Sequence, residues 1–345
     1  MTFSCQQEKG YPQPLGVITM FNKTLLATAV MLVMTSTAQA KTFKVGLGDP
    51  IDSDQGAYAQ RFEELVESLS DGEMQVELFP GGQLGTETGM IQDARIGKLD
   101  FAMAGIGNLT PYAPRLGALT MPYVLLSHAD AVKATTGPLA DEWNQIAEKE
   151  AGVHILGWHY SNFRYLTNSK RPVTSLEDLE GLKIRVPQNK IMLATYEAWG
   201  ANPISMSWPE VFTGLQQGVI DGQDNPDIVN YTMKFQEVQQ YLTEIHSQYS
   251  LQPIMMGMRS YKKLSDEERE IIDRAGLEAQ LYGLQFQLTE AAEARAAMEA
   301  EGMQSAQLTD EDKWISIAKE EVWPQFYDEI GGKESFDRLQ KALGH

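Results

Sequence analysis

The sequence predicts an α/β fold of two lobes that face each other across a ligand cleft, with long helices in the C-terminal part. Strand and helix patterns alternate between residues 43 and 104 and again between residues 153 and 221. Such alternation is typical of sheets with helices packed on them, and two such units place a cleft between them. The length of 345 residues suits about two domains, and the hydrophobic content of 43% is sufficient for full-sized cores.

The first unit is defined by alternating apolar positions and by turn residues. An amphipathic helix is predicted over residues 55–69, and a second helix begins after Thr86, a typical N-cap, and ends near Gly97. Strands are predicted over residues 43–47, 74–79 and 99–104. The strand–helix–strand–helix–strand order predicts a mostly parallel sheet.

The second unit repeats this order. Strands are predicted over residues 153–160, 164–168, 183–186 and 218–221. A short helix is predicted after a capping box formed by Thr174 and Glu177. Further helices are predicted over residues 190–199 and from Pro209 to about residue 216.

The C-terminal part is predicted to be helical. Ser265 and Glu268 form a capping box that opens a very long helix, predicted to reach Glu301. A further helix is predicted from Thr309 to about Ile330. Helices of this length can pack across both lobes and act as a spine.

Residues 1–40 have the pattern of a secretory signal peptide. A mildly basic start at Met20 precedes an apolar run over residues 25–34, and Ala38-Gln39-Ala40 matches a cleavage site. The apolar run is too short for a stable membrane span. We therefore expect Met20 to be the true start and the protein to be exported to the periplasm in soluble form. The one cysteine, Cys5, lies in this leader, so the processed chain has no thiol for disulfides, metal binding or nucleophilic catalysis.

The chain is acidic, with a formal net charge of −19. Lys9, Lys23 and Glu8 give the leader a net charge of +1, so the processed chain carries −20. A field of this sign repels nucleic acid and anionic membrane surfaces, so neither is an expected partner. It also mildly repels an anionic ligand, which must then be held by local arginine geometry.

The sequence contains no recognisable catalytic or cofactor motif. It has no Gly-x-Ser-x-Gly elbow, no His-Glu-x-x-His zinc motif and no phosphate loop, and two glycine pairs after strands lack the third glycine of a dinucleotide site. The five histidines have no metal-ligand spacing. We therefore predict no catalytic residues, no metal, no cofactor and no enzymatic activity.

Two segments point to the binding of a small organic anion. Residues 181–187 form a short strand in which apolar side chains alternate with Lys183 and Arg185. Arg185 is either a surface charge or an anion ligand, and its planar guanidinium can hold a carboxylate through two parallel hydrogen bonds. Residues 221–226 form a predicted turn that presents Asn225, whose amide both donates and accepts.

These segments belong to a larger set of motifs through which residues 41–345 resemble the substrate-binding proteins of tripartite ATP-independent periplasmic (TRAP) transporters, the DctP family. The motifs are Pro80 to Gly85, Pro122-Tyr123-Val124, Arg164 before Thr167-Asn168, Gly181 to Pro187, Asn202-Pro203 to Val211, Asp221 to Pro226, and Phe235 to Gln239. One position departs from the family pattern, because Asp224 stands where a glutamate is usual before the asparagine.

The resemblance implies a two-lobed periplasmic binding protein with a long hinge-crossing helix. The first lobe would comprise residues 41–162 and 251–290, and the second residues 163–250 and 291–345. The lobes would close on an organic acid and deliver it to a TRAP membrane permease driven by an ion gradient. We expect the binding protein to be a monomer.

The resemblance also implies roles for individual residues. Arg185 matches the arginine that grips the ligand carboxylate, and Asn225 matches the asparagine that bonds the same carboxylate or its neighbour; a purely local turn role for Asn225 remains the alternative. Arg164 matches a second arginine that either contacts the ligand or braces the site. Trp208 stands where the family places an aromatic ring against the ligand, with simple packing within the lobe as the alternative.

Three further residues are candidates for contacts with ligand hydroxyls. Asn108 follows a predicted strand at the presumed cleft, and Glu87 lies at a helix start, where a carboxylate is also favoured by the helix dipole. Gln55 is a candidate of the same kind.

This set of residues favours a sugar acid, either a hexuronate or an aldonate, as the ligand. A sugar acid needs one arginine clamp, several hydroxyl partners and a stacking ring, whereas a four-carbon dicarboxylate needs cations at both ends of the site. The alternatives are a dicarboxylate or keto acid ligand, an exported enzyme acting on uronates, and a binding protein that docks onto a membrane sensor.

Overall fold

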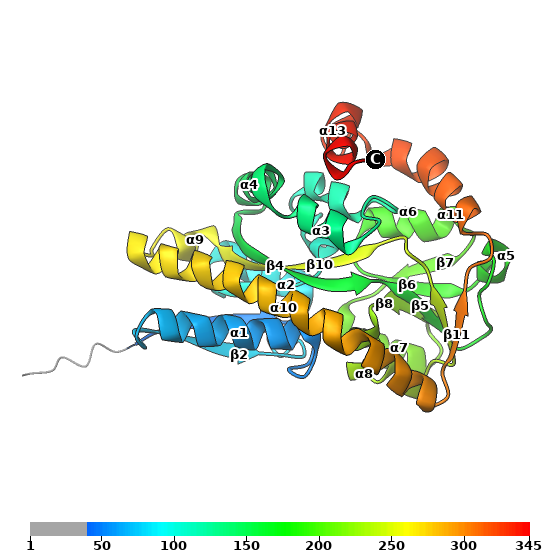
Figure 1. The fold of residues 1–345 in the computed structure, drawn as a ribbon, viewed down its shortest axis with the longest axis horizontal. Coiled ribbons are helices and arrows are strands. Elements are labelled where there is room, and N and C mark those ends of the chain that lie inside the picture. Colours follow the sequence, from blue (N-terminus) through cyan, green and yellow to red (C-terminus); the bar gives the residue numbers. More distant parts are fainter. Residues whose placement is uncertain (1–39) are drawn as a thin grey trace, which may run out of the picture. The chain divides into compact units, whose positions relative to one another are not determined.

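Two β-sheets with helices packed around them organise residues 40–345, the part of the chain that the computed structural model describes (Figure 1). This arrangement confirms the predicted α/β class. The predicted signal peptide, with Cys5 and the expected start at Met20, lies outside the described residues. Within residues 40–345, no helix combines the length and the apolar character that crossing a membrane requires.

The first sheet has the strand order β2-β1-β3-β10-β4. Its strands are β1 (Lys41–Leu47), β2 (Met74–Phe79), β3 (Phe101–Met103), β4 (Val153–Phe163) and β10 (Tyr249–Gly257). Strand β1 is parallel to β2 and β3, as the sequence predicts, but β10 runs antiparallel to both β3 and β4. The sheet is therefore mixed, because β10 returns to it from a segment in which no strand was predicted.

The second sheet has the order β11-β9-β5-β8-β6-β7. Its strands are β5 (Tyr165–Asn168), β6 (Lys183–Val186), β7 (Asn202–Ser205), β8 (Gly222–Asn225), β9 (Tyr241–Glu244) and β11 (Gln304–Gln307). Strand β6 lies between β7 and β8 and is parallel to both. This central position carries Arg185 into the interior of the protein.

The strand predicted over residues 218–221 is wrong, because the strand of this segment covers Gly222–Asn225. Gly218 has a positive φ of 70° and Val219 is 47% exposed, so this segment is a turn. The strand begins at Gly222 instead and ends at Asn225, which is therefore a strand residue and not a turn residue. All four strand residues are buried, but the sequence Gly-Gln-Asp-Asn lacks the apolar side chains by which a buried strand is predicted.

The helices of the first half of the chain begin where the sequence provides side-chain caps. The Ser53 and Thr86 side chains accept hydrogen bonds from Gly56 N and Gly89 N, which fixes the starts of the first two helices. These helices are α1 (Asp54–Leu69) and α2 (Glu87–Ile96), and α3 (His128–Ala134), α4 (Gly137–Ile146) and the helical turns η1 (Ile106–Leu109), η2 (Pro114–Thr120) and η3 (Ala147–Ala151) follow.

The middle of the chain contributes shorter helices. They are α5 (Leu176–Leu179), α6 (Lys190–Ala198), η4 (Trp208–Glu210), α7 (Val211–Gln216), α8 (Asp227–Thr232) and η5 (Phe235–Glu237). The capping box of α5 lies one residue later than predicted. Ser175 is the N-cap, which places Asp178 at N3, and Asp178 Oδ2 accepts from Ser175 N at 3.0 Å.

The predicted long helix is present as α10 (Asp266–Ala300), which follows α9 (Met258–Tyr261). Its Ser265–Glu268 capping box is confirmed. Helix α10 packs against α1 and β4 of the first half and against α8 of the second (Figure 1). Gly276 permits this close approach, because a Cβ there would lie 2.7 Å from the Leu156 carbonyl oxygen.

The predicted helix over residues 309–330 is broken into shorter pieces. These pieces are α11 (Glu311–Ile317), a π-helical turn η6 (Ala318–Val322) and α12 (Trp323–Phe326), and a separate helix α13 (Lys333–Leu343) ends the chain. Asp310, not Thr309, precedes the first piece, and Pro324 has no N–H for a regular helical bond. Trp323 Nε1 donates to Pro122 O at 2.9 Å, and α13 packs against α3.

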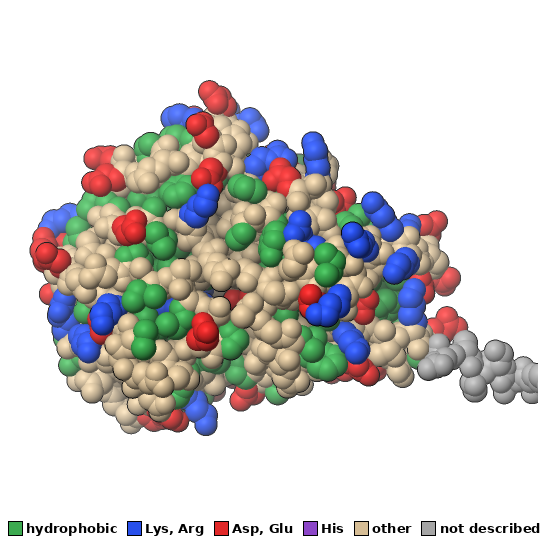
Figure 2. All heavy atoms as spheres, turned by 180° about the vertical axis from the view of Figure 1, so that it is seen from behind, with side chains coloured by type: hydrophobic (Ala, Val, Ile, Leu, Met, Phe, Trp, Pro, Cys, Tyr) green, Lys and Arg blue, Asp and Glu red, His purple; other side chains and the backbone are tan. Residues whose placement is uncertain are grey.

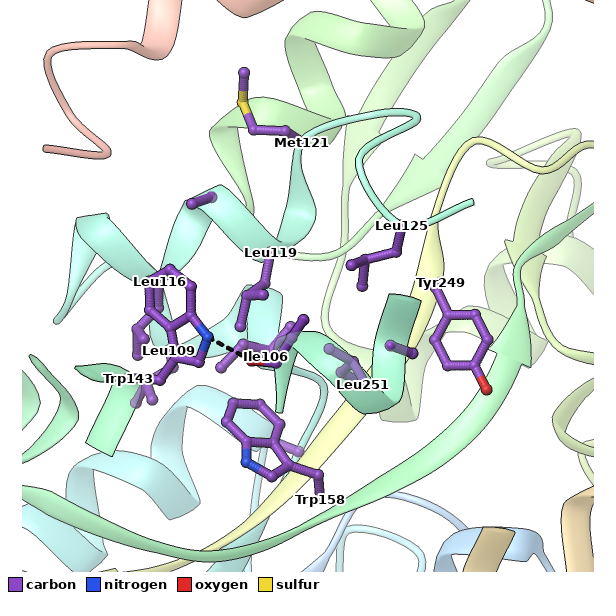
Figure 3. Close-up of a cluster of buried hydrophobic side chains, with 14 of the residues drawn as sticks. Ile106, Leu109, Leu116, Leu119, Met121, Leu125, Trp143, Trp158, Tyr249 and Leu251 are labelled. Carbon is purple, nitrogen blue, oxygen red and sulfur yellow. Dashed lines mark hydrogen bonds between the residues drawn. The ribbon is translucent and has the colours of Figure 1, made fainter. Parts of the chain in front are cut away.

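A large apolar cluster packs around the helical turns η1 and η2 (Figure 3). Leu109, Leu116 and Leu119 from η1 and η2 pack with Trp143 and Trp158. Trp143 is held in addition by its Nε1, which donates to the Ala134 carbonyl oxygen at 2.8 Å. This rigid core supports the loop after β3, one wall of the cavity described next.

Candidate functional site

A small cavity is lined by residues from both sheets, and several of them follow the carboxyl ends of parallel strands, where α/β proteins commonly bind ligands. It measures about 50 Å³, counted as the space that the centre of a water molecule can reach. Its lining residues are Asp49, Glu87, Gly105, Ile106, Gly107, Asn108, Thr120, Arg164, Arg185, Pro187, Met192, Trp208, Asn225, Gln248, Tyr249, Ser250, Leu251 and Gln252. Six of the seven predicted site residues are among them.

Arg185 is a buried cation and not a surface charge. It lies on the central strand β6 and is 3% exposed. Its Nε donates to the Met206 carbonyl oxygen at 3.0 Å, the one hydrogen bond recorded for this guanidinium within residues 40–345. Burial, followed by the neighbouring Arg164, lowers the pKa of Arg185 to about 10, so the group stays positively charged at neutral pH. The remaining guanidinium N–H groups are available to an anion in the cavity.

Arg164 is braced by protein groups while it lines the same cavity. Its Nη2 donates to Asp224 Oδ1 at 3.0 Å and to the Asp224 carbonyl oxygen at 2.5 Å. The Asp224 side chain is 1% exposed, so this ion pair is shielded from water. Of the two roles left open by the sequence, the brace is present in the structure, and ligand contact remains a prediction. Asp224, which stands where the resemblance implies a glutamate, thus reaches the arginine.

Asn225 is held in place by a chain of amides. Its Nδ2 donates to Gln223 Oε1 at 2.6 Å, and Gln223 Nε2 donates to Asn230 Oδ1 at 2.9 Å. Asn230 Nδ2 returns a hydrogen bond to the Asn225 carbonyl oxygen at 2.8 Å. This closed network fixes the end of β8 at the cavity.

The Trp208 ring packs against Arg185. The Arg185 guanidinium carbon lies 5.2 Å from the Trp208 ring centroid, and Phe235 meets the ring edge-on at 5.8 Å. Trp208 is 5% exposed, and its Nε1 has no hydrogen-bond partner within the described residues. A buried donor without a partner is costly, so this N–H is suited to a ligand oxygen.

Glu87 and Asn108 lie together in the cavity wall. Asn108 Nδ2 donates to Glu87 Oε2 at 2.8 Å, and Gly105 N donates to Glu87 Oε1 at 3.3 Å. Burial raises the pKa of Glu87, an effect that Arg185 opposes. Gly48 permits the approach of this carboxylate to Trp208, because a Cβ on Gly48 would lie 3.3 Å from both Glu87 Oε1 and Trp208 Cδ1.

Gln55 is not brought into the cavity. Its Oε1 accepts from Asp49 N at 3.0 Å, and its Nε2 donates to Gln252 Oε1 at 2.5 Å. Gln55 thus supports two lining residues from behind. The predicted contact between Gln55 and ligand hydroxyls stays a prediction.

Sequence reasoning missed Asp49 and the polar residues of β10. Asp49 lies two residues after β1, at the carboxyl end of a parallel strand, a position that could have identified it. Burial, then the charges of Asp54 and Glu87, raise the pKa of Asp49 to about 8. Gln248 and residues 250–252 line the cavity from β10 or the loop before it, where no strand was predicted.

The family profile of the bacterial extracellular solute-binding proteins, family 7 (DctP), matches residues 49–329. The chain belongs to this family. Its members are transport proteins of the periplasm that bind small organic acids and work with a TRAP permease. The resemblance drawn from the sequence motifs is therefore confirmed.

Similar proteins with characterised ligands include sugar-acid binders. The 2,3-diketo-L-gulonate-binding periplasmic protein of Escherichia coli is 32% identical over 72% of this chain and 75% of its own. A TRAP solute-binding protein from Polaromonas, solved with D-erythronate, superposes with a TM-score of 0.84 at 28% identity and covers 87% of this chain and 98% of its own. A Roseobacter denitrificans protein solved with L-galactonate has a TM-score of 0.81 at 29% identity, with 89% and 99% covered. These likenesses confirm the two-lobed periplasmic binding protein fold.

Proposed function

We propose that this protein captures a sugar acid, an aldonate or a hexuronate, in the periplasm and delivers it to an ion-gradient-driven TRAP permease. The observation that carries the proposal is the buried guanidinium of Arg185. It faces a cavity that is also lined by polar side chains able to bond ligand hydroxyls. A bidentate bond to a carboxylate would use its free N–H groups. The sugar-acid ligands of similar proteins support the same conclusion.

The charges around the cavity favour a single carboxylate on the ligand. Arg164 is neutralised by its pair with Asp224, whereas Arg185 forms no ion pair within residues 40–345 and is the cation left to balance a ligand carboxylate. Glu87 offers an acceptor for hydroxyls and repels a second carboxylate, and Asp49 adds a further polar partner for hydroxyls. This arrangement disfavours the alternative of a four-carbon dicarboxylate.

We further propose that residues 1–40 are a secretory signal peptide and that the processed protein acts as a monomer. The mixture of acidic and basic side chains on the face shown in Figure 2 is consistent with a water-exposed surface. A basic start, a short apolar run and a small-x-small cleavage pattern support export. Mass determination of the mature N-terminus and sedimentation of the purified protein test these two points.

We also propose lobe limits, which the two sheets support. The first sheet takes its strands from residues 41–163 and 249–257, and the second from residues 165–244 and 304–307. This division supports lobes close to residues 41–162 with 251–290 and residues 163–250 with 291–345. Strand β4 of the first sheet leads into β5 of the second, and β9 of the second sheet leads into β10 of the first. We propose that these two connections form the hinge.

A thermal-shift screen of residues 41–345 tests the proposed function. The probes are galactonate, erythronate, glucuronate, succinate and pyruvate. A ligand that binds the native state raises its stability by RT ln(1 + [L]/Kd), so a tight sugar acid should raise the melting temperature by several degrees. Stabilisation by succinate or pyruvate alone contradicts the proposed ligand class.

A further inference from the structure

The cavity is electrostatically asymmetric. Arg185 and Arg164 contribute cations, whereas Asp49 and Glu87 contribute two acidic side chains to the same small space. Asp49 is 5% exposed and takes part in no recorded ion pair within residues 40–345. A ligand that brings its own negative charge must be accommodated beside these two acids.

We propose that Asp49 and Glu87 form an acid pair that carries one proton when the ligand is bound, so that the site takes up a proton on capture and selects hydroxy monocarboxylates over matched dicarboxylates. This inference deepens the proposed function and rests on it, because it concerns the same cavity and the same ligand class.

Two buried carboxyl groups in one small cavity disfavour double ionisation, because each charge raises the cost of the other. Glu87 is the member that keeps its charge. Its oxygens accept from Gly105 N and Asn108 Nδ2, and Arg185 also favours its ionised form. The proton therefore resides on Asp49.

The groups that face Asp49 agree with this assignment. Asp54 from α1 and Glu87 from α2 disfavour its negative charge, whereas the nearby Trp208, Gln252 and Arg185 favour it. Burial, then the charges of Asp54 and Glu87, outweigh these neighbours and raise the pKa of Asp49 to about 8. Asp54 is itself engaged by His159, whose Nε2 lies 2.9 Å from Asp54 Oδ2.

The small size of the cavity links this proton to ligand capture. The cavity measures about 50 Å³ and Asp49 is 5% exposed, so a sugar acid enters only when the lobes separate and water reaches Asp49. A solvated aspartate has an ordinary pKa near about 4. Closure around an anionic ligand removes that water and adds a negative charge, and both changes favour protonation of Asp49.

The same acid pair binds the end of the ligand that carries hydroxyl groups and no carboxylate. An ionised Glu87 accepts from a hydroxyl, while a protonated Asp49 and the free Nε1 of Trp208 donate to hydroxyl oxygens. A terminal carboxylate in that position has no proton to offer Glu87 and adds a third negative charge. The site thus discriminates between a CH₂OH end and a COO⁻ end on the same carbon skeleton.

The first test counts protons in the unmodified protein. Titration calorimetry at pH 7 in phosphate and in Tris, with galactonate or erythronate as the probe, gives proton uptake from the difference in apparent enthalpy. We expect uptake approaching one proton and an affinity that falls by up to about tenfold per pH unit between pH 6 and 8. Binding without proton uptake would overturn the proposal.

Two variants locate the proton. Asp49→Asn keeps the shape of a neutral acid, so we expect it to bind with little pH dependence. Asp52→Asn removes an exposed acid from the same loop and should retain the pH dependence of the unmodified protein. An Asp49→Asn variant that keeps the full pH slope contradicts the assignment.

Matched ligands test the selectivity. Galactonate is compared with galactarate, and erythronate with meso-tartrate, pairs that differ only in oxidation of the terminal carbon. We expect at least tenfold weaker binding of the diacids, and a smaller gap in a Glu87→Gln, Asp49→Asn double variant. Equal binding of a matched pair refutes the acid pair but leaves the proposed function intact, whereas no binding of any sugar acid refutes the proposed function itself.

Discussion

Arg185 is the residue on which the binding proposal depends most. Replacing it with alanine removes a charge-assisted bidentate bond and leaves the ligand carboxylate unpaired, so we expect affinity for a sugar acid to fall by about 2–5 kcal/mol. Arg185→Lys should also bind poorly, because a point charge does not reproduce the planar fork. Calorimetry measures both variants, and a loss of less than tenfold for Arg185→Ala would refute the clamp.

Trp208 provides a second test at the residue scale. Trp208→Phe keeps an aromatic face beside Arg185 but removes the free Nε1, so we expect affinity to fall by about 0.5–1.5 kcal/mol, the usual net value of one hydrogen bond. Trp208→Ala should lose more, because it also removes the ring that lies 5.2 Å from the guanidinium carbon. If Trp208→Phe binds as well as the unmodified protein, the indole N–H has no role in recognition.

Individual residues also show why the site was only partly predictable. Arg185 and Trp208 were predicted because a cation within an apolar strand and an aromatic at a family landmark are local signals. Asp49 had a positional signal that was overlooked. Gln252 and Ser250 had none, because they reach the cavity only through the return of β10 to the first sheet, a long-range pairing that no local pattern indicates.

At the scale of elements, α10 is attached to the second sheet by a buried ion pair. Arg295 Nε donates to Asp227 Oδ1 at 2.8 Å, and its Nη1 donates to Glu244 Oε1 at 2.7 Å. Asp227 begins α8, two residues after Asn225, so this contact also fixes the edge of the cavity. Arg295→Ala leaves a buried carboxylate unpaired.

We expect Arg295→Ala to lower the free energy of unfolding by about 3–5 kcal/mol, as is typical when one partner of a buried pair is removed. Arg274→Ala on the same helix is the matched control, because its pair with Glu278 is largely exposed and such pairs contribute about 0.5 kcal/mol or less. Urea denaturation measures both. Similar losses in the two variants would contradict a structural role for the buried pair.

The elements differed in how well the sequence predicted them. Helix α10 was predicted almost to the residue because its capping box and its length are local properties. Strand β8 was missed because its four residues are polar, and they are buried only through hydrogen bonds such as that between Gln223 and Asn230. The C-terminal helix was predicted as one piece because a π-helical turn leaves no mark on the apolar pattern.

At the scale of the whole molecule, net charge and local charge oppose each other. The chain carries −19 overall, yet the site that is proposed to hold an anion presents a buried arginine. Long-range repulsion slows the approach of an anionic ligand, and salt screens it over a Debye length of about 8 Å at physiological ionic strength. The local clamp is buried and is screened much less.

We therefore expect the association rate constant for a sugar acid to rise as ionic strength increases from 10 to 150 mM. Over this range the Debye length shortens from about 30 to about 8 Å, so the long-range repulsion is screened. The dissociation rate constant should change less, because it depends on contacts inside the closed cavity. Stopped-flow measurement of intrinsic tryptophan fluorescence gives both constants. An association rate that falls with added salt would show that local cations, and not the net charge, steer the ligand.

The orientation of the ligand in the cavity is the most direct test of the account. A crystal structure of residues 41–345 with galactonate should place the ligand carboxylate within hydrogen-bonding distance of both terminal nitrogens of Arg185, and its hydroxyl end beside Asp49 and Glu87. A carboxylate bound at the acidic end, or a ligand bound outside this cavity, would contradict it.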